Sequence, residues 1–161
     1  MLFRSPKEDE NKKFGPRDNL VFEALTSTRD GKAMFLGMEE ALLQDDQVTT
    51  PTYQSKTRII KFVDDKPVKE IAYELETVPT ITVAGLTVGE TGLVDMAAID
   101  ENTSYTMERA YMPLAKKTVI RIFKIKDIDK AQDVTNIESL KKHKDLKPVE
   151  KELILNLEDI L

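Results

Sequence analysis

A group of carboxylates in this sequence could in principle pair for acid–base chemistry. Glu90, Asp95, Asp100 and Glu101 lie within one short stretch, and two carboxyl groups whose surroundings push their pKa values apart can act as general acid and general base. Asp and Glu are seldom buried without partners, and nothing in the sequence indicates that these side chains are buried. We therefore interpret them as part of a solvated acidic loop, and an enzyme that uses Asp100 and Glu101 is the third of three functional hypotheses.

The stretch GLTVGETG, from Gly85 to Gly92, comes nearest to a phosphate-binding loop. Glycines let backbone N–H groups approach an anion. However, the stretch lacks the Gly-Lys-Ser/Thr ending of a P-loop and the glycine spacing of a dinucleotide-binding fingerprint. We therefore expect these glycines to form turns within a β-structure.

A second stretch comes near to a calcium-binding loop. It places Asp127, Asp129, Asp133 and Glu138 at four of the ligand positions of that loop. The loop also needs an oxygen ligand at its fifth position and a glycine at its sixth, where this chain has Ala131 and Gln132. We predict no metal site here and interpret the acids as residues that favour a helix N-terminus.

The sequence has no cysteine and a single histidine, His143. This excludes disulfides, thiolate nucleophiles and metal sites rich in cysteine or histidine. His143 lies among charged residues, so we expect it at an exposed position of a helix. We assign no catalytic residue and expect no cofactor. No apolar run approaches the roughly 20 residues of a membrane span, and the start of the chain lacks the apolar centre of a secretory signal. The sequence therefore predicts a cytoplasmic protein, or one within a particle assembled in the cytoplasm, with no membrane partner.

Basic and aromatic residues alternate along two predicted strands. A small barrel that binds single-stranded nucleic acid needs cations that follow the phosphates and aromatic faces that stack on the bases. A formal net charge of -5 argues against such binding over the whole surface, but a local patch remains possible. The candidate contacts are Lys56, Arg58, Lys61, Lys117, Arg121 and Lys124.

The chain divides into a polar arm over residues 1–18, a β-rich body over residues 19–126 and a helical tail over residues 127–161. In the body, two β-favouring runs flank a turn at Asp30-Gly31, and two more flank Asp64-Asp65-Lys66-Pro67, which predicts two hairpins. Residues 115–126 alternate as a further strand with apolar residues on both faces, which is typical of a central or covered strand. The segment between residues 92 and 112 gives no clear pattern.

The tail contains two helix-start signals. Thr135 and Glu138 have the spacing of a capping box, and Pro148 suits the first position of a second helix. Spacings of three and four residues then predict an apolar stripe that either covers the chain's own sheet or binds another protein subunit. The stripe, our candidate partner-binding site, consists of Leu153, Ile154, Leu157, Ile160 and Leu161.

Taken together, these patterns predict an α+β or mainly β protein, with a small antiparallel sandwich or barrel of about five to seven strands and a C-terminal helical tail. As function we predict a non-catalytic protein-interaction or assembly subunit, for example a structural component of a larger particle such as a phage-type virion, and not an enzyme. Its partners would be other protein subunits, of the same or a different kind. The alternative is an OB-like protein that binds single-stranded nucleic acid.

Overall fold

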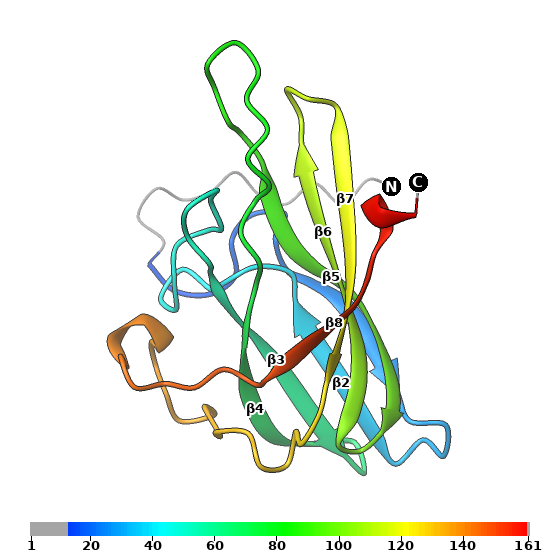
Figure 1. The fold of residues 1–161 in the computed structure, drawn as a ribbon. Coiled ribbons are helices and arrows are strands. Elements are labelled where there is room, and N and C mark those ends of the chain that lie inside the picture. Colours follow the sequence, from blue (N-terminus) through cyan, green and yellow to red (C-terminus); the bar gives the residue numbers. More distant parts are fainter. Residues whose placement is uncertain (1–12, 161) are drawn as a thin grey trace, which may run out of the picture.

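The computed structural model, which describes residues 13–160, contains two antiparallel four-stranded sheets that form an open sandwich (Figure 1). The strand orders are β1-β2-β3-β4 and β5-β6-β7-β8, so every strand pairs with a neighbour in sequence. The first sheet consists of β1 (Phe22–Ser27), β2 (Ala33–Met38), β3 (Lys56–Val63) and β4 (Lys66–Glu74). The second consists of β5 (Glu90–Asp100), β6 (Thr103–Met112), β7 (Lys117–Ile125) and β8 (Lys151–Asn156).

Both predicted hairpins of the first sheet are confirmed. The turn between β3 and β4 places Asp64 and Asp65 at φ 48° and 60°, a left-handed conformation that Asp tolerates better than most residues. The turn between β1 and β2 has Gly31 at φ 73°, and the Thr28 hydroxyl donates to Asp30 Oδ1 over 2.7 Å. These local signals account for the positions of both turns, while each hairpin also contains one register irregularity within its strands.

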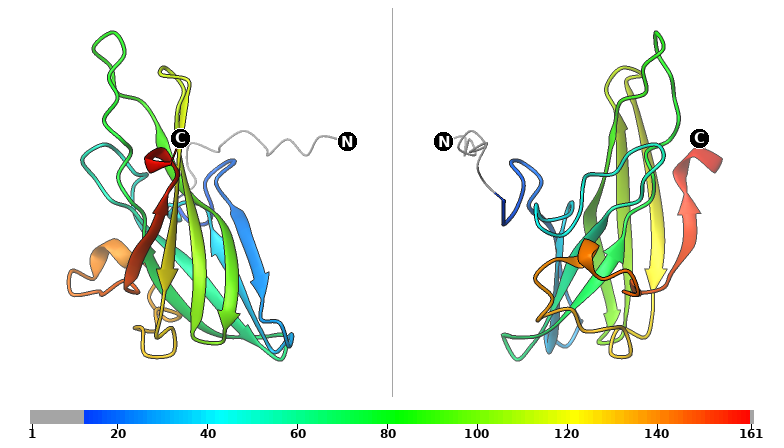
Figure 2. Two further views of the ribbon diagram at one scale, coloured as in Figure 1. Left: turned by 45° about the vertical axis from the view of Figure 1, so that its right-hand side comes forward. Right: turned by 90° about the vertical axis from the view of Figure 1, so that its left-hand side faces the viewer.

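The core lies between the two sheets, as the side views show (Figure 2). It is built from the inward-facing residues of both layers, among them Phe35, Ile59, Tyr73, Leu93 and Ile125. At one edge the sheets approach closely, where the backbone N–H of Ala98 on β5 donates to Thr26 Oγ1 on β1. At the other edge β4 and β8 do not pair, and Ile128 and Val149, from the connection between β7 and β8, are part of the core.

Residues 127–150, which we call the strap, connect β7 to β8 and run along the outer side of β4 (Figure 1). The backbone N–H groups of Val134 and Val149 donate to the carbonyls of Glu70 and Ala72 on β4, so the strap satisfies part of the β4 edge. A second apolar cluster forms beneath it from Ala72, Val134, Ile137, Leu140 and Leu146. The strap contains only one short 3-10 turn, η1 (Leu140–Lys142).

The mainly β fold is confirmed, but the predicted C-terminal helical tail is wrong. Thr135 does not cap a helix: its hydroxyl donates to Asp133 and accepts the N–H of Glu70 on β4. The apolar run after Pro148 forms β8 and the 3-10 turn η2 (Leu157–Asp159). Its leucine spacing fits a helix and a strand equally well, and the free edge of β7 selects the strand.

The described part of the chain has eight strands rather than five to seven. The additional strands are β5 and β6, in the segment without a clear pattern, and β8 in the tail. The predicted polar arm lies mostly outside the described residues, and Leu161 of the candidate partner-binding site lies outside them too. Among the described residues, no helix is long and apolar enough to cross a membrane.

Candidate functional site

A groove of about 560 Å³ lies between the β7–β8 pair and the two ends of the strap. We call it the lysine groove, because its walls carry five lysines and three carboxylates. The lysines are Lys124, Lys126, Lys130, Lys147 and Lys151, and the carboxylates are Asp127, Glu150 and Glu152. The groove therefore has an excess of positive charge within a chain that is acidic as a whole.

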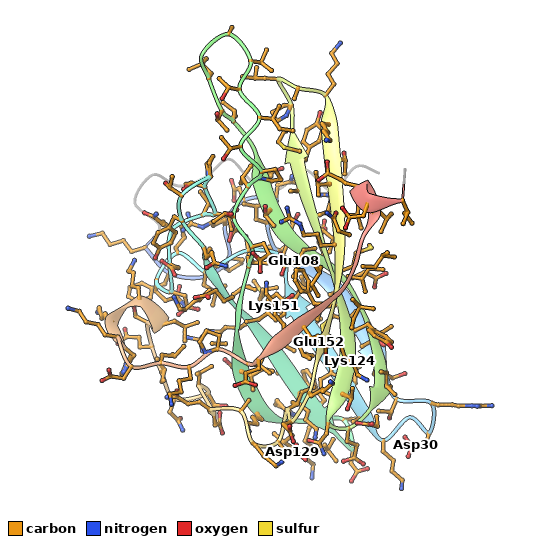
Figure 3. All side chains as sticks on the ribbon, viewed as in Figure 1. Asp30, Glu108, Lys124, Asp129, Lys151 and Glu152 are labelled. Atoms are coloured by element: carbon orange, nitrogen blue, oxygen red, sulfur yellow. The ribbon has the colours of Figure 1, made fainter. Side chains whose placement is uncertain are left out.

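The β7–β8 register decides which of these side chains point into the groove. Lys124 pairs with Glu152 across the ladder, and Ile125 pairs with Lys151. Because side chains alternate between the faces of a strand, Lys124 and Glu152 share the outer face, while Lys151 shares the inner face with the buried Ile125. Figure 3 shows Lys124 and Glu152 side by side, and Lys151 close to Glu108.

Two lysines of the groove are held by carboxylates of the groove itself. Lys126 Nζ lies 2.9 Å from Glu152 Oε2, and Lys130 Nζ lies 2.7 Å from Asp127 Oδ1. The hydrogen bond from Lys126 lowers the pKa of Glu152, and the bond to Asp127 raises the pKa of Lys130. These pairs keep Glu152 ionised near neutral pH, which makes it a weak base.

Lys124 and Lys147 form no ion pair with any residue between 13 and 160. The backbone N–H of Lys147 donates to Gln132 Oε1 over 3.1 Å, which joins the two ends of the strap at the groove wall. Glu150 likewise has no cationic partner in that part of the chain. The groove thus contains two cations and one carboxylate that are available to a ligand.

Behind the groove, Lys151 enters the edge of the sandwich between β4 and β8 and pairs with Glu108 on β6. Its Nζ lies 2.6 Å from Glu108 Oε1 and 2.6 Å from the Glu74 carbonyl oxygen. It also lies 4.3 Å from the centre of the Phe123 ring, a distance at which a cation is attracted to the aromatic face. Lys151 therefore positions β8 and is already engaged, unlike Lys124 and Lys147.

Glu108 is 1% exposed and is the centre of this buried network. Besides Lys151, it accepts the hydroxyl of Tyr73 over 2.7 Å and the backbone N–H of Glu76 over 2.9 Å. Burial, together with the charge of Glu108, holds the pKa of Tyr73 well above its ordinary value. Tyr73 therefore remains a proton donor, and the network supports the groove rather than reacting with a ligand.

A second pair of buried acids, Glu39 and Glu40, follows β2 on the side of the sandwich next to β5. Burial raises the pKa of each to about 7. Glu40 accepts the backbone N–H of Thr49 over 3.1 Å, and Glu39 Oε1 lies 3.5 Å from Arg109 Nη2. Sequence reasoning missed both, because the stretch from Glu39 to Gln44 is compatible with one helical turn and gives no sign that its acids are buried.

The predicted nucleic-acid contacts do not form one surface. Arg58 is buried in a bidentate contact with Asp45 and also bonds Glu70 on β4, and Lys61 pairs with Asp129 of the strap over 2.7 Å. Of the six, only Lys124 lines the lysine groove. Lys56 pairs with Glu74, Lys117 pairs with Glu158, and Arg121 lies opposite Glu108 and Asn156 in the ladder.

The other predicted sites are dispersed as well. Gly85 to Gly92 spans the far half of a projecting hairpin and the start of β5, and Asp100 and Glu101 lie at the β5–β6 turn. The acids of the calcium-like stretch are spread along the strap, and among residues 13–160 no three His, Asp or Glu side chains are arranged to hold a metal ion. Leu153, Ile154 and Ile160 are about half exposed or more, and their role as partner contacts stays a prediction.

A family model described as "Phytase-like: Esterase-like activity of phytase" matches residues 3–160, almost the whole chain. The chain therefore belongs to the phytase-like family. No curated protein and no solved structure matches it. This membership contradicts two predictions, the non-catalytic assembly subunit and the absence of enzyme activity, and it gives no support to the virion or OB-like alternatives. Those predictions were wrong because they rested on the absence of a recognisable catalytic motif, and the family match shows that this absence does not exclude an enzyme.

Proposed function

We propose that this phytase-like chain is a hydrolase that cleaves an ester bearing anionic groups, such as a phosphate ester, and that the substrate binds in the lysine groove. The family name and its description both point to ester hydrolysis. The excess of lysine in the groove supports an anionic substrate, because a lysine ammonium binds phosphate as a compact point charge.

Substrate binding is assigned to Lys124 and Lys147. Both line the groove, and neither forms an ion pair within the described chain, although Lys124 lies opposite Glu152, whose first partner is Lys126. Lys126 and Lys130 can reach the same anion only by exchanging their present partners. Binding should therefore weaken as salt rises, since the groove is open to solvent and its charges are screened.

Glu150 is assigned as the general base. It lines the groove without a cationic partner, whereas Asp127 and Glu152 are each held by a lysine. In this scheme Glu150 takes a proton from a water molecule, whose oxygen forms a bond to the phosphorus or acyl carbon of the ester. The bond to the leaving alcohol oxygen breaks, that oxygen takes a proton from solvent, and the lysines stabilise the negative charge that develops.

The observation that carries the proposal is that two available cations and one available carboxylate line a single groove. We would measure hydrolysis of 4-nitrophenyl phosphate and 4-nitrophenyl butyrate by the full chain, and phosphate release from phytate. The double variant Lys124→Met/Lys147→Met should raise KM for the phosphate esters about tenfold or more, since a charge-assisted hydrogen bond contributes roughly 1.5–3 kcal/mol.

Lys144→Met is the matched control, because Lys144 is an exposed lysine of the strap that does not line the groove. It should leave the kinetics unchanged. If the chain hydrolyses none of the three esters, or if the double variant behaves like the control, the proposal is wrong.

A further inference from the structure

One end of the sandwich carries a projecting hairpin that the proposed hydrolase function does not use. From Thr77 to Gly89 the sequence TVPTITVAGLTVG has no charged residue, although 33% of the chain is charged. Figures 1 and 2 show this segment rising beyond the end of β5, next to the turn that joins β6 to β7. We call residues 79–89 and the turn residues 113–116 together the tip.

The hairpin of the tip is a built structure with its own hydrogen bonds. Val83 and Leu86 exchange two backbone bonds of 2.9 and 3.0 Å, and the hydroxyls of Thr82 and Thr87 are 2.9 Å apart. Ala84 and Gly85, at φ 52° and 80°, make the turn. Asn or Asp usually takes the place of Ala84 in such a turn, and alanine keeps the summit free of polar side chains.

The base of the hairpin is fixed to the second sheet. Val78 packs with Ala110, Met112 and Val119, and Ile81 packs against the same cluster. At Gly89 a Cβ atom would lie 2.7 Å from Val78 Cγ1 and 2.8 Å from the Tyr111 carbonyl oxygen. Glycine is therefore needed for the hairpin to approach β6, and this approach holds both parts of the tip at the same end.

Several apolar side chains of the tip are exposed, with a cation beside them. They are Val83 (37%), Leu86 (60%), Val88 (46%) and Leu114 (45%), and Tyr111 (42%) lies next to them on β6. Lys116 lies on the neighbouring turn, is exposed and forms no ion pair within the described chain, and Lys117 begins β7. Apolar side chains grouped in this way are typical of surfaces that meet a partner. Lys116 adds an unpaired cation beside them, whereas Lys117 is paired with Glu158.

We infer that the tip docks on the surface of an anionic lipid bilayer. A convex summit that lacks charge can enter the boundary between headgroups and acyl chains, where burial of apolar side chains gives the affinity. Lys116 would then face the negatively charged headgroups, which attract a lysine near the surface. A protein pocket would have to match the shape of both loops, whereas a fluid bilayer adapts to them.

This contact differs from a membrane span, and it is independent of the proposed ester hydrolysis. The sequence predicts no membrane partner because it has no apolar run long enough to cross a bilayer. Docking by a hairpin needs no such run. It needs only a few apolar side chains at one end of the molecule and a favourable charge beside them.

The chain has no tryptophan, so a single introduced tryptophan reports on its own surroundings. We would mix the full-length Leu86→Trp variant with vesicles of phosphatidylcholine alone and of phosphatidylcholine with phosphatidylserine. We expect a blue shift of the emission with the anionic vesicles and a much smaller shift with the neutral ones. Leu153→Trp is the matched control, because Leu153 is 51% exposed on β8 and should show no shift.

Vesicle co-sedimentation provides the second measurement. Leu86→Asp should lower binding to the anionic vesicles about tenfold or more, because it replaces a leucine that would be buried in the bilayer by a charged side chain. Lys116→Glu should weaken binding to anionic vesicles only. Absence of binding and of any shift would overturn the inference. So would a shift that appears without lipid as the protein is concentrated, since the tip would then bind a second copy of the chain.

Discussion

Replacing Lys151 with methionine should destabilise the sandwich through one buried charge. The variant removes the ammonium that lies 2.6 Å from Glu108 Oε1, while methionine keeps most of the apolar stem. Glu108 is 1% exposed, so its charge cannot be solvated by water in place of the lysine. Breaking one partner of a buried pair costs about 3–5 kcal/mol.

The hydrogen bonds that remain place the expected value at the lower end of that range. Glu108 still accepts the Tyr73 hydroxyl and the Glu76 N–H, so we expect a loss of about 3 kcal/mol in the free energy of unfolding. Adding Glu108→Gln to the variant removes the stranded charge. The double variant should therefore recover about 2 kcal/mol, which is a coupling energy typical of residues in contact.

Urea unfolding followed by far-UV circular dichroism measures these values. Lys126→Met is the matched control, because Lys126 forms an ion pair with Glu152 in which both side chains are more than half exposed. Such a pair contributes at most about 1 kcal/mol. If Lys151→Met costs no more than Lys126→Met, or if the two substitutions at the buried pair are simply additive, the reasoning about the Glu108 network is refuted.

Two further predictions concern buried charges elsewhere in the fold. The pKa of Glu40 is about 7 in the folded chain instead of its ordinary 4.5. Protonated Glu40 therefore makes its full contribution to the free energy of unfolding below pH 4.5, and this contribution is lost as the pH rises to about 7. This loss amounts to about 3 kcal/mol. Glu40→Gln should remove only the part of the pH dependence between pH 4.5 and 8 that Glu40 causes, because Glu39 has the same raised pKa and causes the rest. A urea-titration slope unchanged by the substitution would show that Glu40 is ionised throughout. Arg58→Met should leave Asp45 buried without its cation and cost about 3–5 kcal/mol. It should also speed amide hydrogen exchange at Val134, whose carbonyl accepts from Arg58; exchange that remains slow there would show that the strap is held without Arg58.

The sequence predicts the parts of the fold that local chemistry determines. Asp30-Gly31 and Asp64-Asp65 specify their hairpins, because these residues accept the positive φ values that such turns need. Strand β5 could not be recognised in this way, since its sequence ETGLVDMAAID mixes acids, alanine and glycine, and its pairing with β6 contains two irregularities. Its pairing depends on β6 and on contact with β1, which no local pattern encodes.

The tail shows the same limit for the candidate site. The run LILNL is compatible with a helix and with a strand, and only the free edge of β7 decides between them. The pairing of β8 with β7 places Lys151 inside the sandwich and brings Lys147 and Glu150 into the same groove as Lys124. No spacing rule joins residues so far apart, so the groove could be found only in the fold.

The most direct test of the central claim is the steady-state rate of phosphate-ester hydrolysis by Glu150→Gln. Positioned general bases contribute about 10²–10⁴-fold to the rate, so the variant should lose at least about a hundredfold in kcat with KM nearly unchanged. Glu138→Gln, an exposed acid of the strap outside the lysine groove, should keep the full rate. If Glu150→Gln and Glu138→Gln have equal kcat, the lysine groove is not where the ester is cleaved.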